Sequence, residues 1–192
     1  MNKLNKMKLF LSLLFSLCAF SASAQSSLNE TLKQQMLKDW ERAKAYTQEY
    51  LNAMPADKYD FRAVDSIRSF AEQMLHLAFA NVALAAVGTS VQNGGVQNIF
   101  LSQDLEKSPT AQNKDSVVYY IDTSYDFVIN AIKNMDFDKI GEVVVQNTPR
   151  GKRSEIRLAW LLKAFEHQTH HRGQCTIYIR LLGIRPPGEK LF

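Results

Sequence analysis

The sequence predicts an all-α protein, an up-down-down-up four-helix bundle with a long crossover between the second and third helices. Three segments repeat apolar residues at intervals of three and four, the spacing of one helical face. A fourth segment is apolar on every side and must therefore be buried among the others. The connection after it is longer than antiparallel neighbours need, so it suits a crossover that makes helices two and three parallel. We find no internal repeat and no convincing strand.

Residues 1–24 are expected to be a cleaved secretory signal peptide. Three lysines precede the apolar run Leu9 to Phe20, and Ala22-Ser23-Ala24 has the form of a small-x-small cleavage site. The run is too short for a membrane span, so no stable span should remain after cleavage. We therefore expect an exported protein, periplasmic or secreted, in which residues 25–192 form a single domain.

The composition of residues 25–192 narrows the function classes. Losing the lysines of the signal peptide lowers the formal net charge of +4 by three, and no basic stripe interleaves with aromatic residues. Nucleic acid is therefore not an expected partner. Cys175 is the only cysteine left, so no internal disulfide can form and packing must stabilise the fold.

The first helix is expected over residues 28–54, and Pro55 ends it. Ser69-Phe-Ala-Glu72 has the form of a capping box and should begin the second helix. This second helix is apolar apart from His76 and one asparagine, so we expect His76 to lie in the core. Gly88 is expected to close it.

Residues 89–113 form the long crossover, and their length motivates the hypothesis that they cover a cavity around His76. The third helix is expected over about 115–135. Residues 136–153 form a second connection whose basic cluster, Pro149 to Arg153, is interpreted as a solvated loop. Ser154 is the expected cap of the fourth helix, which runs to Leu182 before Gly183.

Three of the four histidines lie on the fourth helix. His167 and His171 are one turn apart and project from the same apolar face, which is a spacing of metal ligands. With His76, three neutral imidazoles with one or two positions left to water make the arrangement of a catalytic metal site. We predict that His76, His167 and His171 bind a divalent metal; the alternative is three core histidines hydrogen-bonded to neighbouring helices.

Two other metal architectures do not fit. A zinc protease needs His-Glu-x-x-His with the glutamate as general base, and here Gln168 takes that place. Di-iron bundles need two Glu-x-x-His motifs, and the chain has neither.

Further residues are candidates for orienting the imidazoles or touching substrate: Glu72, Glu166, His170, Gln174 and Tyr178. Glu72 lies one turn before His76, although its capping role explains it as well. His170 is rotated by about 100° from His171, with Glu166 one turn away as its candidate partner. Gln174 and Tyr178 follow on the histidine face, where packing is the alternative for Tyr178. No catalytic acid or base can be named.

The run His167-Gln-Thr-His-His-Arg-Gly-Gln174, followed by Tyr178 to Gly183 and Pro186-Pro187, resembles the last helix of the DinB/YfiT-like superfamily. His76, in Met-Leu-His-Leu, is similar to that family's first ligand. The resemblance implies an up-down-down-up bundle, often a homodimer, that binds a divalent metal through these three histidines, with zinc or nickel expected. Members of known activity include thiol S-transferases that use bacillithiol or mycothiol, and relatives acting in isomerisation or hydrolysis.

Three functions from different classes remain open. The first is a metal-dependent hydrolase or thiol transferase acting on a small molecule in the cell envelope. Because those thiols are cytoplasmic, an exported member fits hydrolysis better. The second is a metal-binding protein without turnover, and the third is a bundle that has lost its metal and acts as an interaction module.

Overall fold

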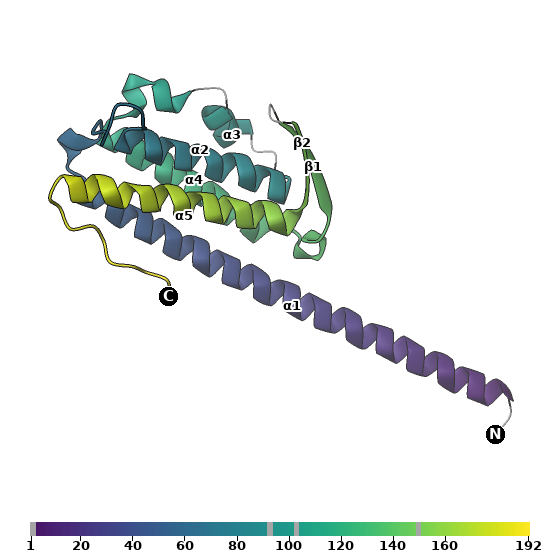
Figure 1. The fold of residues 1–192 in the computed structure, drawn as a ribbon. Coiled ribbons are helices and arrows are strands. Elements are labelled where there is room, and N and C mark those ends of the chain that lie inside the picture. The colour runs from purple at the N-terminus through teal and green to yellow at the C-terminus, as the bar shows by residue number, and fades with distance from the viewer. Residues whose placement is uncertain (1–2, 92–93, 102–103, 149–150) are drawn as a thin grey trace.

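The computed structural model describes residues 3–91, 94–101, 104–148 and 151–192 (Figure 1). Most of these residues are helical, which confirms the predicted class, and one small two-stranded sheet joins them. One hydrophobic core runs between the four long helices and is lined by aromatic and aliphatic side chains from each of them.

Helix α1 spans Lys3–Ala53, so it begins far earlier than the expected start at residue 28. No glycine or proline interrupts this stretch, and nothing in it therefore opposes helix continuation. The N-terminal part extends beyond the rest of the protein (Figure 1). By residue 29 the helix packs against the rest of the protein, because Asn29 is buried and donates a 2.9 Å hydrogen bond to Asp138. Pro55 follows the end of α1, as predicted, and a 3-10 turn at Ala56–Lys58 comes next.

Helix α2, Phe70–Thr89, begins with the predicted capping box. The Ser69 hydroxyl accepts from the Glu72 amide at 3.2 Å, and the Glu72 carboxylate accepts from the Ser69 amide at 2.8 Å. Among the described residues, α2 is the helix that is long and apolar enough to cross a membrane, but most of it is buried inside the protein. It is therefore placed as the core helix that its composition predicted.

The prediction that Gly88 closes α2 is wrong, because the helix continues to Thr89 and Ser90 takes the left-handed cap position with φ of 56°. Gly88 instead allows α2 and α5 to approach closely. A Cβ at Gly88 would lie 3.0 Å from the Leu161 Cγ and 3.1 Å from the Trp160 Cβ.

Replacing Gly88 by valine is expected to lower the free energy of unfolding by about 1–3 kcal/mol, because the branched side chain would overpack this contact. Gly173, in the middle of α5, is the matched control, because a Cβ there would meet nothing within 4 Å. Gly173→Ala should raise the free energy of unfolding by about 0.5–1 kcal/mol. Urea titration of both variants gives the two signs, and a stable Gly88→Val variant would contradict the packing role.

The long crossover carries structure of its own: α3 at Gly94–Leu101 and 3-10 turns at Leu105–Lys107 and Pro109–Ala111. It returns the chain to the start of α2, because the Glu106 carboxylate accepts from Arg68 Nε at 2.5 Å, two residues before α2 begins. Helix α4, Lys114–Asn134, follows with Asn113 as its cap and matches the predicted third helix to within one residue.

Helix α4 packs on α1 and α2 through polar contacts inside the core. The Thr47 and Tyr125 hydroxyls lie 2.7 Å apart between α1 and α4, and Asn81 donates to the Ser124 hydroxyl from α2 at 3.3 Å. At the rim, Lys44 pairs with Asp126 at 2.7 Å. The short turn Phe137–Lys139 then leads into the second connection.

The second connection contains a hairpin where no strand was predicted. Strands β1, Val143–Thr148, and β2, Gly151–Ile156, pair antiparallel with Val143 opposite Ile156. The run of β-branched valines favours a strand, and Gly151 supplies the positive φ of 106° beside the turn. Ser154 is therefore a strand residue and not a helix cap. The interpretation of the basic cluster as a loop is wrong for residues 151–153, while 149 and 150 lie outside the described residues.

Helix α5, Arg157–Leu181, starts two residues later than predicted, with Ile156 and not Ser154 in the cap position, and it ends before Gly183, whose φ is 74°. Its buried face carries Arg172, which is 5% exposed. This guanidinium donates to the Gln168 side-chain oxygen at 2.7 Å and lies over the Tyr46 ring at 4.6 Å. Arg172 thus links α5 to α1, and its charge is satisfied by neutral acceptors and a ring face.

Candidate metal centre

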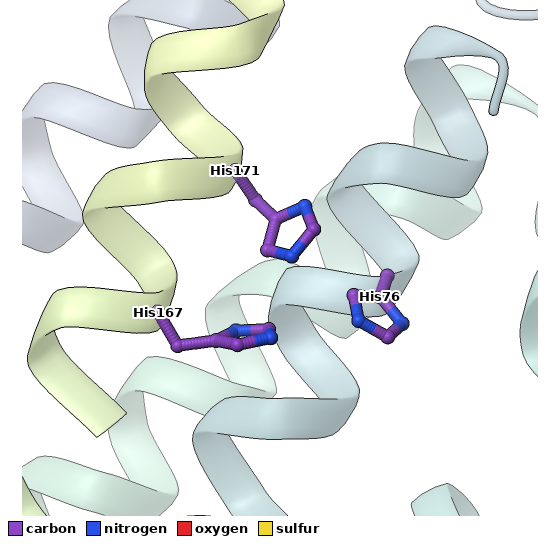
Figure 2. A group of neighbouring side chains, drawn as sticks. All are labelled: His76, His167 and His171. Atoms are coloured by element: carbon purple, nitrogen blue, oxygen red, sulfur yellow. The ribbon is translucent and has the colours of Figure 1, made fainter. Parts of the chain in front are cut away.

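Three imidazoles meet between α2 and α5. His76 comes from α2, and His167 and His171 come from successive turns of α5 (Figure 2). Their candidate ligand atoms all lie within 4.8 Å of one another. The ring centroids of His76 lie 5.2 Å from those of His167 and 4.7 Å from those of His171, and the two α5 rings are 4.4 Å apart. The structure therefore brings together the three histidines that the sequence singled out.

A chain of hydrogen bonds fixes the tautomer of His171. The Tyr178 hydroxyl donates to the Arg68 carbonyl at 2.6 Å, so it accepts from the Gln73 amide nitrogen at 3.4 Å. This turns the Gln73 side-chain oxygen toward His171 Nδ1 at 2.7 Å. Because that oxygen only accepts, Nδ1 carries the proton and Nε2 is left with a free lone pair.

A carboxylate does the same for His76. Glu106 Oε1 lies 2.6 Å from His76 Nδ1, and Arg68 Nε binds the other carboxylate oxygen at 2.5 Å. The Arg68 Nη2 also lies 3.3 Å from Nδ1, but a guanidinium can only donate, so it does not compete for the proton that Nδ1 gives to Glu106. The Nε2 of His76 is again the atom left for a ligand.

The third imidazole has a buried nitrogen that is not satisfied. His167 Nδ1 is buried and has no hydrogen-bond partner among the described residues. Such an atom costs free energy unless something fills it. The candidate ligand atoms of the three histidines lie within 4.8 Å of one another, and neighbouring acceptors orient two of the rings. Such a set of imidazoles is one that a divalent cation of the zinc class accepts. The residues present thus fit a metal.

The electrostatics keep the α5 imidazoles neutral, the form that binds metals. Burial lowers the pKa of His167 to about 4, and the neighbouring His76 adds to the effect. Burial and the adjacent His167 lower the pKa of His171 to about 3. Burial opposes ionisation of Glu106, but the hydrogen bonds from His76 and Arg68 outweigh it and lower its pKa to about 2. Glu106 therefore stays a carboxylate.

A cleft of about 790 Å³ opens beside the histidines. Its walls come from residues 62–73, 104–107 and 170–174, and both His171 and Glu106 line it. Each basic side chain that lines the cleft forms a salt bridge with a carboxylate. The pairs are Arg62 with Glu72, Arg68 with Glu106 and Lys107 with Asp104. Asp104, Glu106 and Lys107 belong to the crossover, which therefore contributes to one wall of the cleft. The hypothesis that residues 89–113 cover a cavity around His76 stays a prediction.

The other candidate residues have different roles. Glu72 caps α2 and pairs with Arg62, and its carboxylate makes no hydrogen bond to His76. Glu166 is exposed, and no described residue pairs with it, so it does not serve His170. The exposed His170 instead lies 3.0 Å from the Gln174 amide nitrogen. Both residues line the cleft, where the Gln174 side-chain oxygen is buried without a described partner.

Tyr178 is buried in the core, as the packing alternative expected, and its hydroxyl also accepts from the Gln73 amide nitrogen at 3.4 Å. Sequence reasoning missed Gln73, Arg68 and Glu106. Gln73 lies three residues before His76 on the same face of α2, which was a usable signal. Nothing in the sequence pointed to Glu106, which lies in the irregular crossover.

Three imidazoles that converge at the edge of a cleft place this helical protein in the class of helical proteins with a histidine cluster that could hold a metal ion. The chain belongs to the DinB family, whose model matches residues 25–191. No curated protein matches it.

Solved structures with the same fold include two DinB-like proteins and one conserved protein. The DinB-like protein from Bacillus cereus ATCC 10987 has a TM-score of 0.65 at 17% identity, over 82% of this chain and 97% of that one. The DinB-like protein from Bacillus subtilis has a TM-score of 0.59 at 18% identity, over 82% of this chain and 96% of that one. The conserved protein from Enterococcus faecalis has a TM-score of 0.59 at 16% identity, over 77% of this chain and 95% of that one. At these identities the likeness shows the fold.

Proposed function

We propose that this protein is an exported, metal-dependent enzyme that holds zinc or nickel through His76, His167 and His171 and acts on a small molecule as a hydrolase or thiol transferase. The observation that carries the proposal is the convergence of the three ligand nitrogens within 4.8 Å. Family membership supports it, and so does the orientation of His76 and His171 by Glu106 and Gln73.

A divalent ion at this place would supply Lewis-acid polarisation of a substrate carbonyl or of water. The chain itself supplies the rest. Glu106 and Gln73 keep two imidazoles in the tautomer that ligates, and burial keeps His167 and His171 neutral. The cleft admits a small molecule beside His171, and this favours turnover over storage of the metal.

Export is supported by the N-terminal pattern, by the free N-terminal part of α1 and by the start of the family match at Gln25. Because bacillithiol-type cofactors are cytoplasmic, hydrolysis is the reaction we favour. N-terminal sequencing of the protein recovered outside the cytoplasm tests this: a chain starting at Gln25 supports export, and a chain that keeps residues 1–24 in the cytoplasm contradicts it.

We also infer the up-down-down-up order of the four long helices, α1, α2, α4 and α5. Contacts between pairs of helices support this order. Helices α1 and α4 are antiparallel, because Lys33 contacts Met135 and Thr47 contacts Tyr125. Helices α2 and α5 are antiparallel as well, because Gly88 lies beside Leu161 and Gln73 contacts Tyr178. Helices α1 and α5 are parallel, because Thr47 contacts Arg172 and Tyr50 contacts Thr176. Homodimer formation stays a prediction.

Metal analysis of purified residues 25–192 tests the proposal. We expect one zinc or nickel ion per chain after dialysis against either metal, and hydrolysis of small ester or amide substrates that a chelator stops. Bound metal with no turnover on hydrolytic or thiol-transfer substrates would favour a metal carrier or sensor. No bound metal at all would favour an interaction module and overturn the proposal.

A further inference from the structure

Glu106 connects two parts of the molecule that are far apart in the sequence. It lies on the 3-10 turn Leu105–Lys107 of the crossover, 30 residues beyond His76. One carboxylate oxygen lies 2.6 Å from His76 Nδ1 and the other 2.5 Å from Arg68 Nε. Glu106 is therefore part of the surroundings of the metal centre and part of the cleft wall at once.

The contact decides which nitrogen of His76 can bind a cation. A carboxylate that accepts the Nδ1 proton holds the ring in one orientation and makes the opposite nitrogen a better donor. Without Glu106, Arg68 is the described hydrogen-bond partner that would remain beside Nδ1. A guanidinium can only donate, so the tautomer with its proton on Nδ1 would lose its acceptor.

The same contact holds the crossover in place. Leu105 is buried, and the Glu106 carbonyl accepts from the Gln112 amide at 2.5 Å. The Glu106 side chain adds hydrogen bonds from this segment to His76 on α2 and to Arg68. Arg68 also joins the second orienting chain, because its carbonyl accepts from Tyr178. Both oriented histidines are thus tied to the residue just before the cap of α2.

We propose that Glu106 is a positioning residue for His76, and that a divalent cation bound at the three histidines and the docked crossover stabilise each other through it. The proposal rests on the proposed metal centre. If docking of residues 104–112 favours the cation by some factor, the bound cation must favour docking by the same factor. The metal centre would then set the shape of the cleft as well as its chemistry.

Zinc affinity is the first readout, measured by competition with a chromophoric chelator on the folded chain 25–192. Glu106→Ala should weaken zinc binding by about 10–100-fold, the usual effect of removing a partner that orients a ligand. Glu106→Gln should lie between wild type and Glu106→Ala, because its amide oxygen can still accept from Nδ1. Glu142→Ala is the matched control, since Glu142 pairs with Arg157 at 3.1 Å beyond the other end of α2.

The rate of amide hydrogen exchange in residues 104–112 is the second readout. If Glu106 had a purely structural role, adding zinc would not change this rate. Zinc should slow exchange there in wild type and in Glu142→Ala, and should have little effect in Glu106→Ala. Circular dichroism checks folding; should Glu106→Ala fail to fold, Glu106→Gln, with a smaller loss of affinity and of zinc protection, carries the test.

The outcomes separate this inference from the proposed function. If wild type binds no zinc, the metal centre itself fails and this inference fails with it. If wild type binds zinc and both Glu106 variants bind it equally well, or if zinc leaves exchange at 104–112 unchanged in wild type, the metal centre stands and the role of Glu106 is overturned.

Discussion

Zinc or nickel affinity is expected to fall by more than about 100-fold when His171 is replaced by alanine. Removal of a residue that merely orients a ligand costs about 10–100-fold, and removal of the ligand itself should cost more. His171 is 6% exposed and its Nδ1 is held by Gln73, so its Nε2 is the oriented donor that the substitution removes. Isothermal titration of the variant with each metal gives the change directly.

The same change should remove the stabilisation that metal gives to the fold. A ligand that binds only the folded state adds about 4 kcal/mol at a thousand times its dissociation constant. Wild type should therefore melt at a clearly higher temperature with metal than without, and His171→Ala should not. His170→Ala is the control, because it removes the adjacent exposed histidine, which contacts Gln174 and lies outside the three-ring cluster. Equal losses in both variants would mean that metal binds elsewhere.

The three histidines could be predicted because each of them leaves a mark in the sequence. A polar residue in an otherwise apolar helix, as at His76, must have a partner, and the spacing of His167 and His171 puts them on one face. Helix boundaries that depend on local chemistry were predictable for the same reason. The capping box at Ser69 and the stop before Gly183 are examples.

What the sequence could not predict depends on contacts between distant segments. Glu106 lies in a stretch without periodicity, and only the return of the crossover to α2 places it beside His76. Gly88 is a residue type that often ends helices, yet here its lack of a side chain makes room for the side chain of Leu161. The hairpin was missed because a lone pair of short exposed strands has no apolar alternation to mark it.

The metal-free protein should lose stability as the pH falls from 7 to 5. A histidine whose pKa in the folded state lies below its value of 6.5 in the unfolded chain binds fewer protons when folded. Its contribution is complete above pH 6.5 and is lost as the pH falls toward the folded pKa, about 4 for His167 and about 3 for His171. Each would remove about 2 kcal/mol between pH 7 and pH 5, and because the two rings interact, about 4 kcal/mol is the upper limit for the pair.

Urea denaturation at the two pH values, with a chelator present, measures this loss. Glu106 does not contribute in this window, because its pKa shifts from 4.5 to about 2 and its stabilisation is lost only below pH 4.5. Replacing His171 by leucine removes one of the two groups, so the loss between pH 7 and 5 should shrink by about half, whatever the stability of the variant at pH 7. A variant that loses as much as wild type, or a wild type equally stable at both pH values, would show that these imidazoles are not held neutral by burial, and with that the reason for their readiness to bind a cation would be gone.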